Sequence, residues 1–142
     1  MIVLEFVKHI RLPNGTLYTG QFDLNGTCRE GFGVQLWPDG SKYIGQWSEG
    51  KASGFGRFIL ADGDCYEGDW LADKAHGEGT YVYADGARYE GQWVNDKQEG
   101  FGQESWPDGS HYQGQYKEGK KNGQGQFTWA DGAYYEGEWL NN

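Results

Sequence analysis

The chain has 142 residues and a formal net charge of −9 at pH 7, from 12 basic and 21 acidic residues. Nucleic acid and anionic lipid are bound through clustered lysine and arginine, so this charge excludes nucleic acid from the expected partners and disfavours a membrane surface. Because no run of about 18 apolar residues occurs, no transmembrane helix is predicted, and we expect a soluble cytoplasmic protein.

The apolar residues of the chain are mostly aromatic. Isoleucine, leucine and valine together number 17, whereas tryptophan, tyrosine and phenylalanine number 24, and 25 glycines accompany them. Each aromatic side chain can bury roughly 150–250 Å². The core is therefore predicted to consist of rings packed against glycine-rich backbone.

The first predicted element is a strand within residues 1–13. In "MIVLEFVKHIRL" the apolar residues Leu4, Phe6, Ile10 and Leu12 fall on one face, in register with the segments that follow. The stretch lacks the small-residue cleavage site of a secretion signal. We interpret it as an N-terminal capping strand that shields the open edge of a repeat array.

Residues 14–142 repeat one sequence frame about six times. Tyrosines recur every 23 residues, at Tyr43, Tyr66, Tyr89, Tyr112 and Tyr135. Around each lies Asp-Gly-x-x-Tyr-x-Gly-x-Trp, with Tyr116 once in place of the tryptophan, and Gly-x-Gly follows eleven residues after the tyrosine. An earlier copy runs from Asn14 to Gly33 with two extra loop residues, and the last copy stops halfway, at "EGEWLNN". A fixed period of this length is the signature of a repeat architecture.

Each copy is predicted to form one β-hairpin. In "KYIGQW" the residues Tyr43, Gly45 and Trp47 share one face, and "GFGRFIL" alternates in the same way. The Asp-Gly pairs suit a type I turn closed by a glycine in the left-handed region. A helix is disfavoured because each repeat holds four or more glycines, at about 1 kcal/mol each. The predicted fold is all-β: an elongated, twisted and open single-layer antiparallel meander of about twelve strands.

A single layer needs a source of stability other than a second layer. The tyrosine and tryptophan of each copy share their face with the glycines, so a ring on one strand can lie over the bare backbone of its neighbour. Two further aromatic-rich columns share this face, two and four residues before each Asp-Gly. The opposite face is expected to be solvated, because it carries the polar residues Lys42, Gln46, Glu67, Asp69, Arg88, Glu90, Gln92, His111, Gln113, Gln115 and Glu136.

The segments "DGARYEGQWVNDKQEGFG" and "DGAYYEGEW" resemble the membrane occupation and recognition nexus (MORN) repeat, and the resemblance covers residues 14–142. It implies a twisted single-sheet array that is noncatalytic and serves as a scaffold, adaptor or regulatory arm. Members of this family occur beside lipid kinase or methyltransferase domains, at membrane junctions and in cytoskeletal assemblies. Some hold a helix or an extended peptide in the groove of the array. A cytoplasmic location at the cytoskeleton or at membrane junctions follows as an expectation.

The aromatic face is the main candidate site, because a hollow lined by tyrosine and tryptophan suits an apolar helix or extended peptide of a protein partner. The same rings can equally form the core, and we expect both roles to be filled. Trp37, Tyr83, Trp106 and Trp129 lack the glycine partner built into the repeat frame and are expected to be the more open rings. The candidate groove comprises Trp37, Tyr43, Trp47, Phe58, Tyr66, Trp70, Tyr81, Tyr83, Tyr89, Trp93, Trp106, Tyr112, Trp129 and Tyr135.

A hairpin edge is the second candidate, because Lys51, Lys74, Lys97 and Lys120 recur there and could bind phosphoinositide or other anionic headgroups. An acidic residue lies one or two positions from each lysine, so the edge is nearly neutral, which favours a purely structural role. Two other hypotheses concern different partners. The array could regulate an enzyme domain absent from this chain, or self-associate, as in a homodimer, through a bare C-terminal edge strand.

No catalytic residue, metal site or cofactor is predicted. His9, His76 and His111 occupy different repeat positions and Cys28 and Cys65 lie away from them in register, so no nucleophile pair, zinc site or disulfide framework can be drawn. The aspartates of the Asp-Gly pairs would be about 10 Å apart, too far to share a calcium ion, and are assigned to the turns. Gly-x-Gly opens a strand here, so the dinucleotide-binding motif fails.

Overall fold

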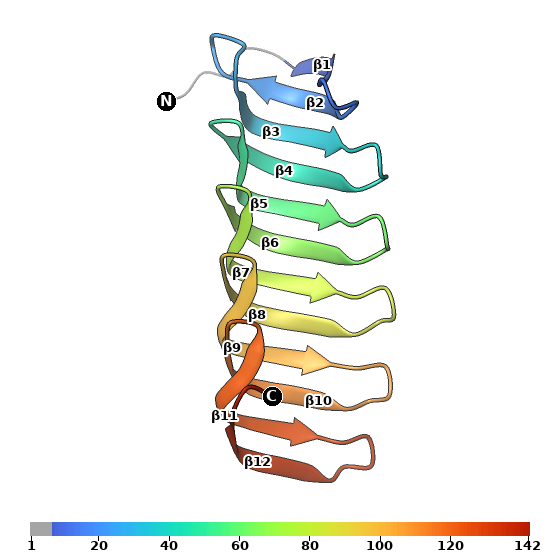
Figure 1. Cartoon of the computed structure of the whole chain (residues 1–142), viewed down its shortest axis with the longest axis vertical. Coiled ribbons are helices and arrows are strands. Elements are labelled where there is room, and N and C mark those ends of the chain that lie inside the picture. Colours follow the sequence, from blue (N-terminus) through green and yellow to red (C-terminus); the bar gives the residue numbers. More distant parts are fainter. Residues whose placement is uncertain (1–6) are drawn as a thin grey trace. The chain divides into compact units, whose positions relative to one another are not determined.

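The structure, a computed structural model, describes residues 7–142. Twelve strands form one open antiparallel sheet whose strand order follows the chain (Figure 1). No helix occurs among the described residues. The predicted all-β meander of consecutive hairpins is confirmed.

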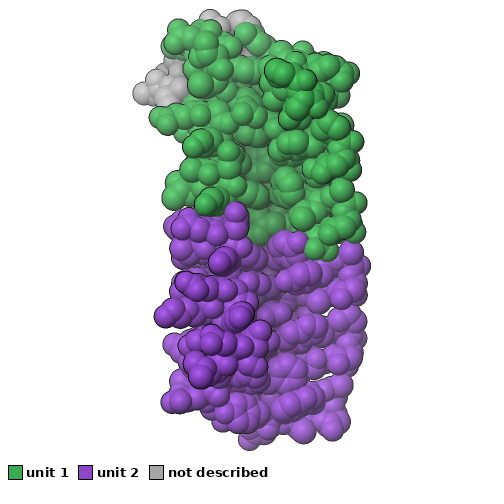
Figure 2. Space-filling view, viewed as in Figure 1, with its two compact units in different colours: residues 1–74 green, residues 75–142 purple. Residues whose placement is uncertain are grey.

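The chain divides into two compact units, residues 1–74 and residues 75–142 (Figure 2). Each unit is described separately. The strands of unit 1 are β1 (Val7–Arg11), β2 (Leu17–Phe22), β3 (Arg29–Leu36), β4 (Lys42–Ser48), β5 (Lys51–Ile59) and β6 (Cys65–Leu71). Those of unit 2 are β7 (Lys74–Val82), which begins at the boundary, β8 (Arg88–Val94), β9 (Lys97–Ser105), β10 (His111–Lys117), β11 (Lys120–Thr128) and β12 (Tyr134–Trp139).

The strand predicted as an N-terminal cap is β1, which pairs with β2 along its whole length. Ile10 on β1 is partly buried and packs against the aromatic cluster of unit 1. Leu4 and Phe6, which the prediction also used, lie outside the described residues. The capping role of residues 1–13 stays a prediction.

The Asp-Gly segments form the predicted turns. After β3, the Gly40 amide donates to the Trp37 carbonyl and the Trp37 amide donates to the Ser41 carbonyl, both at 3.0 Å, and Gly40 has a φ of 94°. The Asp39 carboxylate accepts from the Ser41 amide at 2.8 Å and from its hydroxyl at 2.6 Å. These hydrogen bonds hold the pKa of Asp39 below its usual value. The turn aspartates are therefore committed to their own loops.

The opposite hairpin tips need two consecutive residues in the left-handed region. Between β8 and β9, Asn95 has a φ of 48° and Asp96 a φ of 72°. Two positive φ values in a two-residue connection are typical of the type I′ turn, whose twist matches that of the flanking strands. Asparagine, aspartate and glycine tolerate this region best, which explains the Glu-Gly and Asn-Asp pairs at these tips.

Glycines face one another across neighbouring strands on the face that carries Tyr43 and Trp47, which we call the inner face. In unit 1 the row contains Gly20, Gly33, Gly45, Gly56 and Gly68. In unit 2 it contains Gly79, Gly91, Gly102, Gly114, Gly125 and Gly137. A Cβ on Gly56 would lie 2.1–2.6 Å from atoms of the Tyr43 ring, and one on Gly102 would lie 2.5–2.7 Å from the Tyr89 ring. The prediction that rings lie over bare backbone of the adjoining strand is confirmed.

A bulge accompanies the inner-face tyrosines Tyr18, Tyr43, Tyr89 and Tyr112. The register of β4 with β5 shifts between Gly45 and Trp47. The Tyr43 hydroxyl donates to the Gln46 carbonyl at 2.8 Å, and the Gln46 side-chain carbonyl accepts the Phe55 amide at 2.8 Å. The same pair of bonds recurs around Tyr18, Tyr89 and Tyr112. Gln46 and its counterparts, expected only to face solvent, therefore also satisfy backbone groups at the bulge.

The opposite face, here called the outer face, is exposed as expected, but its composition differs between the units. In unit 1 it carries Phe32 and Phe55, which are 54% and 53% exposed, beside Val34, Ile44 and Ile59. In unit 2 the corresponding rows consist mainly of polar residues, and their exposed apolar members are Val82, Val94, Phe101 and Tyr134. The predicted polar outer face is therefore approximately found in unit 2 and is not found in unit 1.

Candidate functional site

The centre of the inner face is a ladder of edge-on rings, which we call the aromatic ladder. In unit 1 the Tyr43 ring lies 5.1 Å from that of Trp47 and 5.3 Å from that of Trp70, at interplanar angles of 77° and 87°. Such edge-to-face pairs stabilise the core beyond the area they bury. The ladder consists of Tyr18, Phe22, Tyr43, Trp47, Tyr66 and Trp70 in unit 1, and of Tyr89, Trp93, Tyr112, Tyr116, Tyr135 and Trp139 in unit 2.

Most ladder residues of the predicted groove are fully packed. The exposed fraction is 6% or less for Tyr43, Trp47, Tyr66, Tyr89, Trp93 and Tyr112. Burial raises the pKa of Tyr18, Tyr43, Tyr89 and Tyr112, because a phenolate would lose its hydration there, and the pKa of Tyr18 reaches about 12. These rings offer little surface to a partner and act as core.

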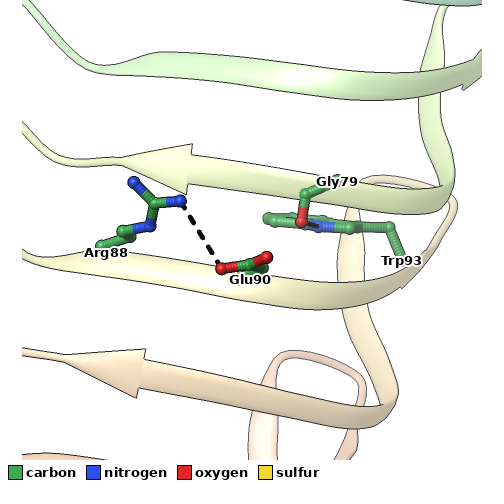
Figure 3. Close-up of polar contacts among 4 residues, drawn as sticks. All are labelled: Gly79, Arg88, Glu90 and Trp93. Atoms are coloured by element: carbon green, nitrogen blue, oxygen red, sulfur yellow. Dashed lines mark hydrogen bonds and ion pairs between the residues drawn. The ribbon is translucent and has the colours of Figure 1, made fainter.

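The indole N–H groups of the ladder tryptophans also form hydrogen bonds within the chain. The Trp93 indole lies against Gly79 and donates its N–H to the Gly79 carbonyl at 3.1 Å (Figure 3). The Arg88–Glu90 ion pair, on the other face of β8, is exposed and lies at 3.5 Å. The same indole bond to a glycine carbonyl is made by Trp47, Trp70 and Trp139. Four of the seven tryptophans therefore have a structural bond for their only donor.

A second row of the inner face, beside the Asp-Gly turns, is more open. This rim row consists of Trp37 and Leu60 in unit 1, and of Tyr83, Trp106 and Trp129 in unit 2. Trp129 is 47% exposed, and the others are half-buried. The Trp106 ring packs 5.5 Å from that of Phe127, and the Trp129 ring 4.8 Å from it. Among the described residues no acceptor is found for the indole N–H of Trp37, Trp106 or Trp129, and none of the three is buried.

Unit 1 has a hollow of about 300 Å³ between the ladder and the rim row, lined by Trp37, Phe58, Trp70 and Asp73 among others. Arg29 fills one side of it. The guanidinium lies 4.6 Å from the Trp47 ring and donates to the Gln35 side chain and, at 2.7 Å, to the Gly50 carbonyl. Sequence reasoning missed Arg29, although its repeat position is alanine in the next two copies, at Ala52 and Ala75.

In unit 2 two inner-face positions depart from the repeat frame together. Tyr116 stands where other copies have tryptophan, and Glu104 stands where other copies have an aromatic ring or glutamine. The Tyr116 hydroxyl donates to Oε1 of Glu104 at 2.5 Å. Burial, together with this bond and the negative charge of Glu104, raises the pKa of Tyr116. The exchange places a half-buried carboxylate among the rings of Tyr89, Tyr112 and Tyr116.

The remaining predicted groove residues are intermediate cases. Phe58 and Tyr81 are half-buried between the ladder and the rim row, Trp70 is a half-buried ladder ring, and Tyr135 is 44% exposed on β12. The predicted headgroup lysines, Lys51, Lys74, Lys97 and Lys120, are exposed at the first position of a strand. The lipid hypothesis and the self-association hypothesis stay predictions.

No reactive constellation is formed by the described residues. Nδ1 of His9 lies 2.6 Å from the Thr19 hydroxyl, and Nδ1 of His76 accepts from the Asn95 amide at 3.4 Å. No group of three histidine, cysteine or acidic side chains within residues 7–142 has the arrangement of a metal site. Cys28 and Cys65 are both free thiols. Within residues 7–142 the structure contains no helix that is long and apolar enough to cross a membrane.

The family model of the MORN repeat matches six segments, residues 29–42, 43–65, 66–88, 89–111, 112–134 and 135–142. No curated protein matches the chain. The chain also aligns with solved structures, among them three domains of CPAP proteins. The TCP domain of SAS-4 (dCPAP) of Drosophila melanogaster, in complex with a proline-rich motif of Ana2 (dSTIL), is 10% identical, with a TM-score of 0.41 over 95% of this chain and 91% of that one.

The G-box domain of the microcephaly protein CPAP is 17% identical, with a TM-score of 0.48 over 94% of this chain and 69% of that one. The TCP10 domain of Danio rerio CPAP, in complex with a peptide of Danio rerio STIL, is 16% identical, with a TM-score of 0.34 over 94% and 68%. All three TM-scores lie below 0.5, and the identities are 17% or less.

Proposed function

The chain belongs to the MORN repeat family, and we propose that it is a noncatalytic scaffold whose inner face binds a segment of a partner protein. The observation that carries the proposal is the division of the tryptophans into two classes. Trp47, Trp70, Trp93 and Trp139 donate their indole N–H to glycine carbonyls of the chain. Trp37, Trp106 and Trp129 keep that donor free, and Trp129 is 47% exposed.

Free indole donors on apolar rings suit a protein segment. Tryptophan is enriched at the centres of protein interfaces because it buries a large apolar area and adds one directional hydrogen bond. A row of such rings, held on a rigid sheet, presents apolar area and donors together. A backbone segment of a partner supplies both the apolar side chains and the carbonyl acceptors that this row lacks.

The proposal is tested by site-specific photo-crosslinking in the native source. A photoreactive phenylalanine analogue replaces Trp129 in one sample and Phe101 in another. The two positions are matched, since Trp129 is 47% exposed on the inner face and Phe101 is 52% exposed on the outer face. We expect a discrete crosslinked protein from position 129 and none from position 101.

A third sample carries Trp106→Ala in addition to the analogue at position 129. The crosslink from position 129 should then fall strongly, because the neighbouring anchor is lost. Equal crosslinking from both faces, or crosslinking at position 129 that is unaffected by Trp106→Ala, contradicts binding on the rim row.

A further inference from the structure

Three rim-row rings follow one another across unit 2, and their spacing is set by the sheet. Tyr83, Trp106 and Trp129 each directly follow a strand, namely β7, β9 and β11. Successive rings are therefore two strands apart, or about 9.6 Å at the usual interstrand spacing. A bound segment that runs across the strands must present a side chain to the same side about every 9.6 Å.

Polyproline II geometry meets this spacing best. It repeats every three residues, or about 9.3 Å. An extended β-strand returns to one face after two or four residues, at about 6.7 or 13 Å. An α-helix comes closest with seven residues, at about 10.5 Å.

The free donors separate the two remaining geometries. In an α-helix the backbone carbonyls accept bonds within the helix, whereas polyproline II leaves every carbonyl free. The indole N–H groups of Trp106 and Trp129 have no acceptor among the described residues. They are thus matched to a segment with open carbonyls.

The charge of unit 2 selects among such segments. Residues 75–142 include 11 acidic and 5 basic side chains. One carboxylate, that of Glu104 on β9, lies on the inner face two residues before Trp106. Its Oε1 is bonded to Tyr116, while Oε2 has no partner in residues 7–142 and is not buried, so it can accept a donor from outside.

The aromatic rings beside Glu104 already contact a positively charged side chain, that of Lys121. The Lys121 ammonium lies 5.3 Å from the ring centroids of both Trp106 and Tyr112. It forms no ion pair with Glu104 at 4.0 Å or less, within the part of the chain that the structure describes. The aromatic wall therefore accommodates a positive charge, and Glu104 remains available for another.

We propose that unit 2 binds a basic segment in polyproline II conformation, with every third residue on the rim row and a lysine or arginine at Oε2 of Glu104. This inference rests on the proposed function and specifies its partner. It makes Trp106 and Trp129 both apolar platforms and hydrogen-bond donors. Glu104 attracts the segment, and Lys121 opposes it.

Synthetic peptides test the proposal on the full chain, by fluorescence anisotropy at low salt. The probe is a labelled peptide of about nine residues built from Pro-Pro-Lys triplets, which spans about 28 Å. Pro-Pro-Glu triplets keep the conformation and reverse the charge. Gly-Ser-Lys triplets keep the charge without the conformation, and an amphipathic helical peptide with the same lysines represents the other geometry.

The Pro-Pro-Lys peptide should bind at least about tenfold more tightly than the three others. Glu104→Gln, which keeps an acceptor for Tyr116, should weaken binding about tenfold, as expected for loss of a charge-assisted hydrogen bond. Glu136→Gln removes the same charge from the outer face of β12 and should change affinity less than twofold. Lys121→Gln should tighten binding by up to about fivefold.

Trp106→Phe keeps a ring and removes the donor, and it should weaken binding about fivefold. Equal effects of Glu104→Gln and Glu136→Gln overturn the Glu104 subsite. A helical peptide that binds best, and loses affinity in Trp106→Ala, overturns the polyproline II geometry but retains the proposed function. If no peptide responds to Trp106→Ala or Trp129→Ala, both proposals fail.

Discussion

The aromatic ladder and the rim row lie on the same face and are built from the same residue types, yet they do different work. Ladder rings lie over glycines, and their hydroxyl and indole groups bond to the backbone of the chain. The rim tryptophans Trp37, Trp106 and Trp129 have no acceptor for the indole N–H among residues 7–142. What decides the role of a ring in this sheet is therefore the residue opposite it, rather than its own identity.

The largest effect on this contrast should come from alkaline pH, which acts on the ladder tyrosines. Burial raises the pKa of Tyr18 to about 12, against about 10 in an unfolded chain. The tyrosine of the unfolded state thus loses its proton at a lower pH than the folded one. Its contribution to the free energy of unfolding is therefore complete below about pH 10 and is lost as the pH rises toward 12. Near-ultraviolet circular dichroism and tyrosinate absorbance should change together above pH 10. Tyrosine ionisation with unchanged dichroism would contradict the packing of the ladder.

Alanine substitutions compare the two rows directly. Tyr89→Ala should lower the free energy of unfolding by about 3–5 kcal/mol, because it removes a fully buried ring from the ladder. Trp106→Ala should lower it by only about 1 kcal/mol, because that ring is half-buried and its donor is free. Denaturant unfolding followed by circular dichroism measures both. Equal losses would remove the distinction between ladder and rim.

Substitution of tryptophan by phenylalanine should have a smaller effect and tests the indole donor separately from the ring. Trp93→Phe should cost about 1–3 kcal/mol, because the Gly79 carbonyl loses its partner. The same exchange at Trp106 should change stability by no more than about 0.5 kcal/mol. The two variants have the same loss of size and differ in the bond that is broken. Thermal unfolding of the two proteins side by side gives the comparison.

The repeat frame was sufficient to predict the fold and the ring-on-glycine contact. Tyrosines spaced by 23 residues and a period of two on each strand place Tyr89 on the face of Gly91 and Gly102. The turns were predictable as well, because Asp-Gly pairs admit few backbone geometries. The turn geometry depends only on neighbours in sequence.

Features that depend on the register between strands were missed. The bulge after Gly45 decides that Gln46 bonds to the Phe55 amide, and no pattern within one strand reveals it. The contact of Glu104 with Tyr116 joins two strands as well. A signal for it was nevertheless present, since both residues depart from the repeat frame in the same copy.

The contact between a ring and a glycine is tested most directly by a double-mutant cycle at Tyr89 and Gly102. A Cβ at Gly102 would meet the Tyr89 ring within 2.7 Å, and Gly102 has no positive φ that would strain an alanine. Gly102→Ala should therefore cost about 2 kcal/mol or more beside Tyr89, and about 0.5 kcal/mol or less in the Tyr89→Ala background. Additive losses of stability would show that the ring does not occupy the space over that glycine.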